Sequence, residues 1–287
     1  KAQMQIRKAE RKKAKLRLGI AAPSGSGKTY SALLMAFGIG GKVGLIDTEH
    51  GSGDLYAHLG DYDVIGIEAP YTVDKYQKAI AAFEQAGYTT IIIDSLSHAW
   101  AGDGGLLDKQ GKIADRGTNS FAAWRTITPE YNALLDAMLQ SPCYIIATMR
   151  AKQEYVLETN DKGKQTPKKV GMAPVQREGM EYEFTVMLDV DMQHIASASK
   201  DRTSLFDGRF FKISEDTGKE LLAWLETGIE GPDVAAILRN ISGSSTVEIL
   251  KSNFEAAMLM LEAVHHNNIT KAKNARYREL TAQKEAA

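Results

Sequence analysis

A glycine-rich octapeptide near the N-terminus constrains the fold of this 287-residue chain more than any other segment. Residues 22–29 read APSGSGKT and stand between a strand-like run at 16–21 and an apolar, helix-like run at 30–37. They match the pattern G-x-x-x-x-G-K-[ST], with Ala22 in place of the first glycine. A chance Gly/Ser turn is the alternative. A glycine-rich turn between strand and helix presents successive backbone N–H groups, which predicts a phosphate-binding loop.

The residue types in this loop predict a nucleotide site. Lys28 is expected to neutralise β- and γ-phosphate oxygens, and the Thr29 hydroxyl to coordinate Mg²⁺. The residues predicted to contact the nucleotide are Pro23, Ser24, Gly25, Ser26, Gly27, Lys28, Thr29 and Tyr30.

Short apolar runs alternate with helical patterns up to about residue 150. The predicted strands are 43–46, 64–67, 91–93 and 144–147, and the predicted helices are 72–86 and 120–140. Because the strands show no polar alternation, helices must cover both faces of the sheet. The pattern therefore predicts an α/β fold with a mostly parallel sheet flanked by helices.

The segment after residue 150 follows a different pattern. Residues 151–180 show no stable periodicity, which predicts a long loop that is either functional or disordered. Runs at 184–190, 194–198 and 210–213 predict consecutive strands that extend the sheet antiparallel at one edge.

The charge is distributed unevenly, although the net charge is only −1. Residues 1–17 carry eight basic side chains and one acidic one, which predicts a basic N-terminal helix or arm. This arm is either solvated, a contact for phosphate backbones, or a contact for an acidic face of a neighbouring subunit. Residues 18–228 form the predicted core. Residues 229–287 predict a small helical C-terminal region, with a capping box at 245–248 and a last helix capped by Thr270.

Composition excludes several classes of protein. With 44% hydrophobic and 25% charged residues, the whole chain is neither disordered nor a coiled-coil rod. The single cysteine, Cys143, cannot form an intramolecular disulfide, which fits a reducing compartment such as the cytoplasm. No apolar stretch approaches the roughly 18–20 residues that cross a bilayer, so no membrane partner is expected.

Two acidic segments follow predicted strands. Asp94 ends the run 91–93, which predicts a Walker B carboxylate that holds magnesium beside the phosphate-binding loop. Glu49 follows the strand 43–46 and is placed to activate water, whereas Asp47 is expected to cap the loop. A surface acidic turn is the alternative for this second segment.

These motifs resemble the RecA family, in which a strand ending in D-x-E-H follows the phosphate-binding loop and the Walker B strand ends in Asp-Ser. Residues 47–50 read DTEH and residues 94–95 read DS, in the same order. The resemblance covers about 16–215 and favours a RecA-like core over AAA+ or adenylate-kinase-like proteins. The layout looks most like phage-encoded RecA-core ATPases proposed to act as single-strand annealing recombinases. It implies ATP and Mg²⁺ as cofactors, Glu49 as the catalytic glutamate, and the cytoplasm of a bacterial host.

The resemblance also implies residues that act between subunits. Lys200 and Arg202 look like a pair of cations that reaches a neighbour's γ-phosphate in a filament or ring, and an ordinary charged turn is the alternative. Arg150 matches an arginine that precedes the family's DNA loop. The glutamine expected beside it is missing, and Thr148 could replace it as a hydrogen-bond donor to the γ-phosphate.

The segment after Arg150 is basic enough to contact single-stranded DNA. We therefore expect DNA contacts from Arg150, Lys152, Lys162, Lys164, Lys168, Lys169 and Arg177. A solvated excursion is the alternative. Residues 98–119, with five glycines and Trp100, are expected to form a companion loop.

Three functions remain open from the sequence. The first is an oligomeric, DNA-dependent ATPase that promotes annealing or recombination. The second is a P-loop nucleotide or small-molecule kinase, although the half of the chain nearest the phosphate-binding loop has no arginine cluster typical of its lid. The third is an ATP-gated assembly factor that does not bind DNA.

Overall fold

The computed structural model describes residues 13–285, except 118, 160–164, 230–231 and 262. The chain divides into two compact units. Ala14–Thr227 form the larger unit, and Gly228–Ala287 belong to the other. Each unit has its own hydrophobic core, and each is described by itself.

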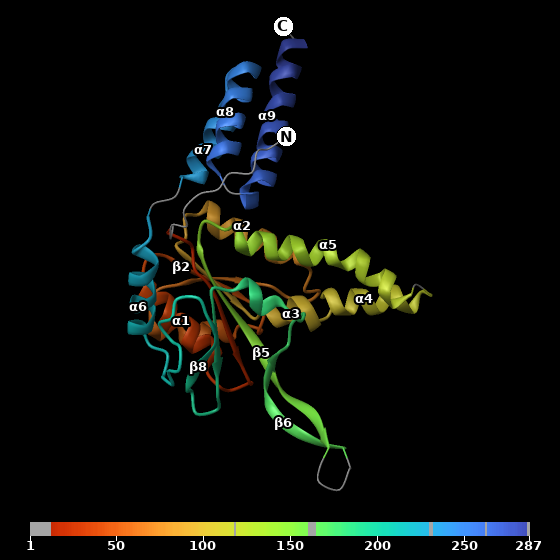
Figure 1. Cartoon of the computed structure of the whole chain (residues 1–287), viewed down its shortest axis with the longest axis vertical. Helices are drawn as coiled ribbons and strands as arrows, with labels where there is room; N and C mark the ends of the chain where they lie inside the picture. The colour runs from red at the N-terminus through yellow and green to blue at the C-terminus, as the bar shows by residue number, and fades with distance from the viewer. Residues whose placement is uncertain (1–12, 118, 160–164, 230–231, 262, 286–287) are drawn as a thin grey trace. The chain divides into compact units, whose positions relative to one another are not determined.

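The larger unit is built on a twisted sheet (Figure 1). The strand order along this sheet is β3-β2-β4-β5-β1-β7-β8. These strands are β1 (Arg17–Ala22), β2 (Val43–Asp47), β3 (Asp63–Gly66), β4 (Thr90–Asp94), β5 (Tyr144–Thr159), β7 (Val186–Val190) and β8 (Ala196–Asp201). Neighbours from β3 to β7 are parallel, and β8 runs antiparallel to β7. The predicted α/β fold, with a mostly parallel sheet and an antiparallel edge, is confirmed.

Helices cover both faces of this sheet. On one face lie α1 (Lys28–Ile39) and α6 (Glu215–Glu226), and on the other lie α2 (Val73–Gln85) and α5 (Ser120–Leu139). The alternation of side chains is plain in β4, where Ile92 packs in one core and Ile91 and Ile93 pack in the other.

Two glycines bring α1 and α6 into backbone contact. A Cβ on Gly38 would lie 1.9 Å from the Glu215 carbonyl oxygen, and a Cβ on Gly218 would lie 2.3 Å from the Met35 carbonyl oxygen. Any larger residue would push the helices apart. The helix that follows the phosphate-binding loop, α1, is therefore held in place by close packing against α6.

The edge of the sheet differs from the prediction. β7 pairs with β1 in parallel, so that a single antiparallel strand follows it. Residues 210–213 are no strand, since only an isolated bridge joins Phe211 to Ala196. An apolar run forms a strand only where a neighbouring strand pairs with several of its residues. Of this run, only Phe211 is paired with a described residue.

Two segments predicted as loops have regular structure. β5 pairs with β6 (Gln165–Pro174) in an antiparallel hairpin that extends beyond the sheet (Figure 1). Backbone pairing of two strands needs no apolar alternation, which is why the sequence pattern missed it. The predicted loop at 98–119 contains most of α3 (Leu96–Ala101) and all of α4 (Leu106–Asp115).

Arg17 belongs to β1 rather than to a solvated arm, and it is 6% exposed. Its guanidinium donates hydrogen bonds to the carbonyls of Leu139, Ser141 and Cys143 at 2.9, 2.5 and 2.8 Å. These carbonyls lie at or just beyond the C-terminal end of α5, where a cation is favourable. Burial lowers the pKa of Arg17 to about 10.

The C-terminal unit is helical, as predicted. Its helices are α7 (Val234–Ser242), α8 (Val247–Met260) and α9 (Ala263–Glu285). α8 is capped by Thr246, one residue after the predicted position, and Thr270 lies inside α9 rather than at its start. None of the helices in the described ranges is long and apolar enough to cross a lipid bilayer.

Candidate active site

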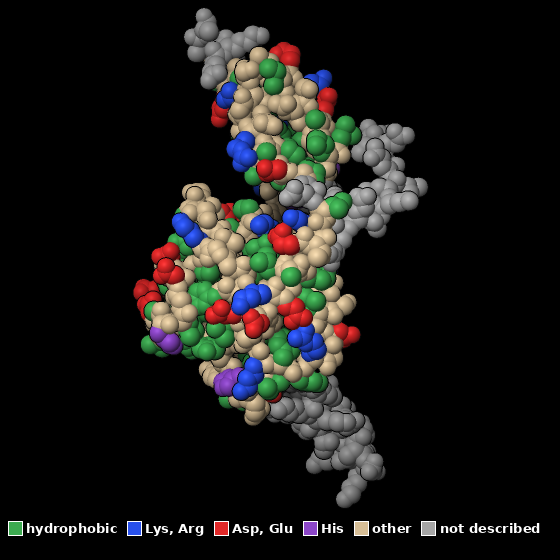
Figure 2. All heavy atoms as spheres, turned by 90° about the vertical axis from the view of Figure 1, so that its left-hand side faces the viewer, with side chains coloured by type: hydrophobic (Ala, Val, Ile, Leu, Met, Phe, Trp, Pro, Cys, Tyr) green, Lys and Arg blue, Asp and Glu red, His purple; other side chains and the backbone are tan. Residues whose placement is uncertain are grey.

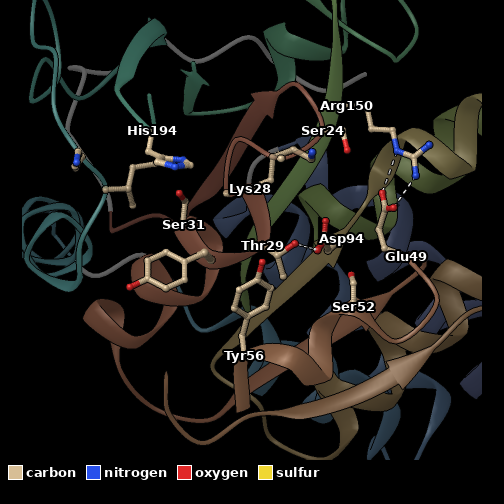
Figure 3. A pocket seen from close by; sticks show the side chains of 15 residues that line it. Ser24, Lys28, Thr29, Ser31, Glu49, Ser52, Tyr56, Asp94, Arg150 and His194 are labelled. Atoms are coloured by element: carbon tan, nitrogen blue, oxygen red, sulfur yellow. Dashed lines mark hydrogen bonds and ion pairs between the residues drawn. The ribbon is translucent and has the colours of Figure 1, made fainter. Parts of the chain in front are cut away.

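The predicted phosphate-binding loop joins β1 to α1 and opens on a cavity of about 660 Å³ (Figure 3). Gly25 and Gly27 both have a φ of 82°, in the left-handed region that favours glycine. The Lys28 ammonium donates to the Pro23 carbonyl oxygen at 3.1 Å. Burial lowers the pKa of Lys28, and the negative charge of Asp94 opposes this. A helix N-terminus with an adjacent lysine is suited to phosphate.

Asp94 ends β4 and is 1% exposed. Its carboxylate oxygens accept hydrogen bonds from the hydroxyls of Thr29 and Thr148, each at 2.5 Å. Burial raises the pKa of Asp94, and the two hydrogen bonds act against this effect. Carboxylate and hydroxyl oxygens are the hard ligands that Mg²⁺ accepts, so Thr29 and Asp94 fit a magnesium ion at the cavity wall.

Glu49 follows β2 and is paired with Arg150 of β5 (Figure 3). Arg150 Nη2 donates to Glu49 Oε2 at 2.6 Å, and Arg150 Nε donates to Glu49 Oε1 at 3.1 Å. Burial raises the pKa of Glu49, but the hydrogen bonds and charge of Arg150 outweigh it, so the pKa lies below its ordinary value. An ionised Glu49 on the cavity wall fits the predicted role of activating water. Arg150 thus contacts the candidate catalytic residue, and its predicted DNA contact stays a prediction.

The loop that carries Glu49 is held by its neighbours. Asp47 accepts a hydrogen bond from the Glu49 backbone N–H at 2.6 Å, which is the capping role predicted for it. The Thr48 hydroxyl lies 2.7 Å from Nδ1 of His98, a residue that the sequence patterns left without a role. Burial lowers the pKa of His98, which favours its neutral form.

Several residues that line the cavity were missed by the sequence patterns. Tyr56 comes from the 3₁₀ helix η1 (Ser52–Leu59), and its ring centroid lies 6.0 Å from that of Tyr30. His194 comes from the turn between β7 and β8, and Lys212 precedes α6. An aromatic shortly after the DTEH segment was the signal available for Tyr56, whereas His194 and Lys212 lie in no motif.

Lys200 and Arg202 are absent from the cavity wall, as far as the described residues define it. The Lys200 ammonium donates to the Glu181 carbonyl at 3.1 Å and also to the Tyr182 carbonyl. Arg202 donates to the same Tyr182 carbonyl at 3.2 Å. Their predicted action on a neighbouring subunit's nucleotide stays a prediction.

The residues predicted to bind DNA fall on different elements. Lys152 is exposed on β5, Lys168 and Lys169 lie on β6, and Lys162 and Lys164 lie outside the described residues. On the face shown in Figure 2, the acidic and basic side chains of the coloured residues are interspersed, and these residues form no continuous basic patch.

Arg177 has a packing role within its own unit. Its guanidinium carbon lies 4.6 Å from the ring centroid of Tyr131 and 5.7 Å from that of Trp124. Trp124 in turn stacks on Trp100 with centroids 5.5 Å apart. The guanidinium therefore extends an aromatic stack by cation–π contact.

A family model described as an AAA domain matches residues 14–218. The match spans the sheet and its phosphate-binding loop, and it indicates a P-loop NTPase-type fold that binds and hydrolyses nucleotide. It does not bear out the preference for a RecA-like core over AAA proteins, which stays a prediction. No curated protein matches the sequence.

Proposed function

Because the chain belongs to the AAA domain family, we propose that it is an ATPase. On the sequence motifs and the site geometry, we propose further that it binds single-stranded DNA and promotes annealing or homologous recombination as an oligomer. The observation that carries the proposal is the ion pair between Glu49 and Arg150. Glu49 lines the nucleotide cavity, and the paired part of the β5–β6 hairpin begins at Ala151. One contact thus connects the site of hydrolysis to the segment proposed to hold DNA.

The residues around the cavity have separate roles in this reaction. Backbone N–H groups of the loop and the Lys28 ammonium bind the phosphates. Mg²⁺, held by Thr29 and Asp94, would neutralise charge on the β- and γ-phosphates. Glu49 orients the attacking water and accepts its proton. Thr148, which now donates to Asp94, is the proposed donor to the γ-phosphate.

Arg150 restrains Glu49 in the absence of DNA. Both carboxylate oxygens of Glu49 accept hydrogen bonds from Arg150, which leaves fewer acceptor sites for water. We propose that DNA on the hairpin draws Arg150 away and frees Glu49. Such coupling would make hydrolysis depend on DNA without any change at the phosphate-binding loop.

Assembly would supply the DNA affinity that a single subunit lacks. The net charge is −1, so an isolated subunit attracts a phosphate backbone weakly. Many subunits along one strand would each add a basic hairpin to a shared surface. In the same assembly, Lys200 and Arg202 would leave their carbonyl partners and complete a neighbour's site.

Phosphate release from ATP, with and without a single-stranded oligonucleotide, tests this function. We expect DNA to raise the rate, and added salt to weaken DNA binding steeply. A variant with Lys152, Lys168 and Lys169 changed to Ala should lose the stimulation. A matched variant with the exposed Lys78, Lys112 and Lys219 changed to Ala should keep the stimulation.

The other outcomes identify the alternatives. Phosphoryl transfer to a nucleoside monophosphate would indicate a kinase. ATP binding with a flat DNA titration would indicate an assembly factor and would overturn the DNA part of the proposal.

A further inference from the structure

The turn between β7 and β8 lies directly against the phosphate-binding loop. His194 Nδ1 is 2.9 Å from the Ser26 carbonyl oxygen, and a Cβ on Gly27 would lie 3.4 Å from the same nitrogen. The Met192 sulfur is 3.4 Å from Ser26 Oγ. Figure 3 shows the imidazole directed from its own strand turn toward the loop. The turn therefore touches the loop through two side chains.

The turn is held in a conformation that costs backbone energy. His194 has a φ of 63°, which a non-glycine residue rarely adopts. The Asp191 carboxylate accepts hydrogen bonds from the backbone N–H groups of Gln193 and Ile195, each at 2.9 Å. These bonds fix the turn and aim the imidazole. His194 and Met192 are both exposed, so the contact adds little to the hydrophobic core.

The hydrogen bond fixes the orientation of one peptide of the loop. A carbonyl oxygen only accepts, so His194 Nδ1 must carry the proton. In a planar trans peptide, the Ser26 carbonyl and the Gly27 N–H lie in one plane and point in opposite directions. A carbonyl held toward His194 therefore turns the Gly27 N–H away from the imidazole and leaves it free to donate to a phosphate.

We infer that His194 is a positioning residue for the nucleotide, because it holds the Ser26–Gly27 peptide in the orientation that binds phosphate. The inference rests on the proposed nucleotide site and adds a residue that no motif contains. The β7–β8 turn would then influence nucleotide affinity, although His194 and Ser26 lie 168 residues apart in the chain.

Equilibrium binding of a fluorescent ADP analogue with Mg²⁺ tests this role without any turnover. His194→Gly removes the donor and relieves the positive φ, so it should fold at least as well as the unmodified chain. We expect its Kd to rise about five- to tenfold, as for the loss of one orienting hydrogen bond. His194→Asn tolerates the positive φ and keeps an N–H donor, so it should restore most of the affinity.

Gln193→Ala is the matched control, since that exposed side chain lies in the same turn, and its Kd should not change. Equal Kd values for His194→Gly and the unmodified chain would overturn the inference. Equal losses in the Gly and Asn variants would do so as well, because the donor would then not matter. If the unmodified chain does not bind the analogue, the proposed nucleotide site itself is wrong, and the role of His194 is overturned with it.

Discussion

The two carboxylates of the site are held in opposite ways. Asp94 is buried, its partners are neutral hydroxyls, and its pKa is raised. Glu49 is partly exposed, its partner is a guanidinium, and its pKa is lowered. A buried carboxylate with two hydroxyl donors stays in place, whereas an exposed ion pair is worth at most about 1 kcal/mol and opens easily. Asp94 therefore belongs to a fixed part of the site, whereas the proposed DNA coupling requires Glu49 to lose its contact with Arg150.

The largest effect is expected from Asp94→Asn. Loss of the magnesium-side charge should lower phosphate release about 10²–10³-fold. The same change should stabilise the nucleotide-free protein. Burial raises the pKa of Asp94 in the folded protein above its pKa in the unfolded chain. Ionising Asp94 therefore lowers the free energy of unfolding as the pH rises through the unfolded-state pKa, and a neutral amide removes that cost.

Thermal unfolding at neutral pH checks the second part of this prediction. The midpoint should rise by about 2–4 °C for each 1 kcal/mol gained. Asp61→Asn, in an exposed loop, is the control and should leave both rate and midpoint unchanged. A fall in the midpoint of Asp94→Asn would contradict the description of Asp94 as a carboxylate whose burial makes ionisation costly.

A smaller effect is expected from Glu49→Gln. The amide cannot accept a proton from water, so the turnover number should fall about 10²-fold. The affinity for nucleotide should be retained, because Glu49 is not expected to bind the phosphates. Its thermal midpoint should stay within about 2 °C of the unmodified chain, as for an exposed ion pair. A variant that loses nucleotide affinity instead would assign Glu49 to binding.

The smallest effect is expected from Arg150→Gln. If Arg150 restrains Glu49, the DNA-independent rate should rise up to about fivefold, which corresponds to an exposed ion pair of about 1 kcal/mol. DNA should then add little.

The pH profile of kcat/KM gives a second readout for Arg150→Gln. Without the guanidinium, only the smaller effects of His98 and Ser95 oppose burial, so the pKa of Glu49 should rise. Glu49 then becomes protonated at a higher pH, so the acid limb of the profile should move to higher pH. Arg125→Gln, at an exposed position of α5, should leave the limb where it is. An unshifted limb in Arg150→Gln would mean that the ion pair does not control the base.

Local motifs were sufficient to predict the fixed part of the site from the sequence. The phosphate-binding loop and Asp94 each lie within a few residues of a strand end, and the sequence pattern carries that information. The position of Thr148 depends on strand order, because β5 lies between β1 and β4 and pairs Thr148 with Ile20. Only the family resemblance suggested a role for it.

Contacts across the sheet could not be predicted from the sequence. Glu49 and Arg150 lie 101 residues apart, and Glu49 follows β2 whereas Arg150 lies on β5, which is not a neighbour of β2 in the sheet. His194 reaches the loop through a turn whose residues resemble an ordinary polar hairpin. Neither contact leaves a periodic pattern, since each depends on where separate strand ends meet in space.

The buried Arg17 limits how the N-terminal segment can be shortened. Its guanidinium closes the end of α5 and lies in the strand that leads into the phosphate-binding loop. A truncation that removed every basic residue up to position 17 would strip a helix of its cap and disturb the site, which would mimic a loss of DNA contact. A deletion designed to measure the arm alone should therefore stop before Ala14, where the core unit begins.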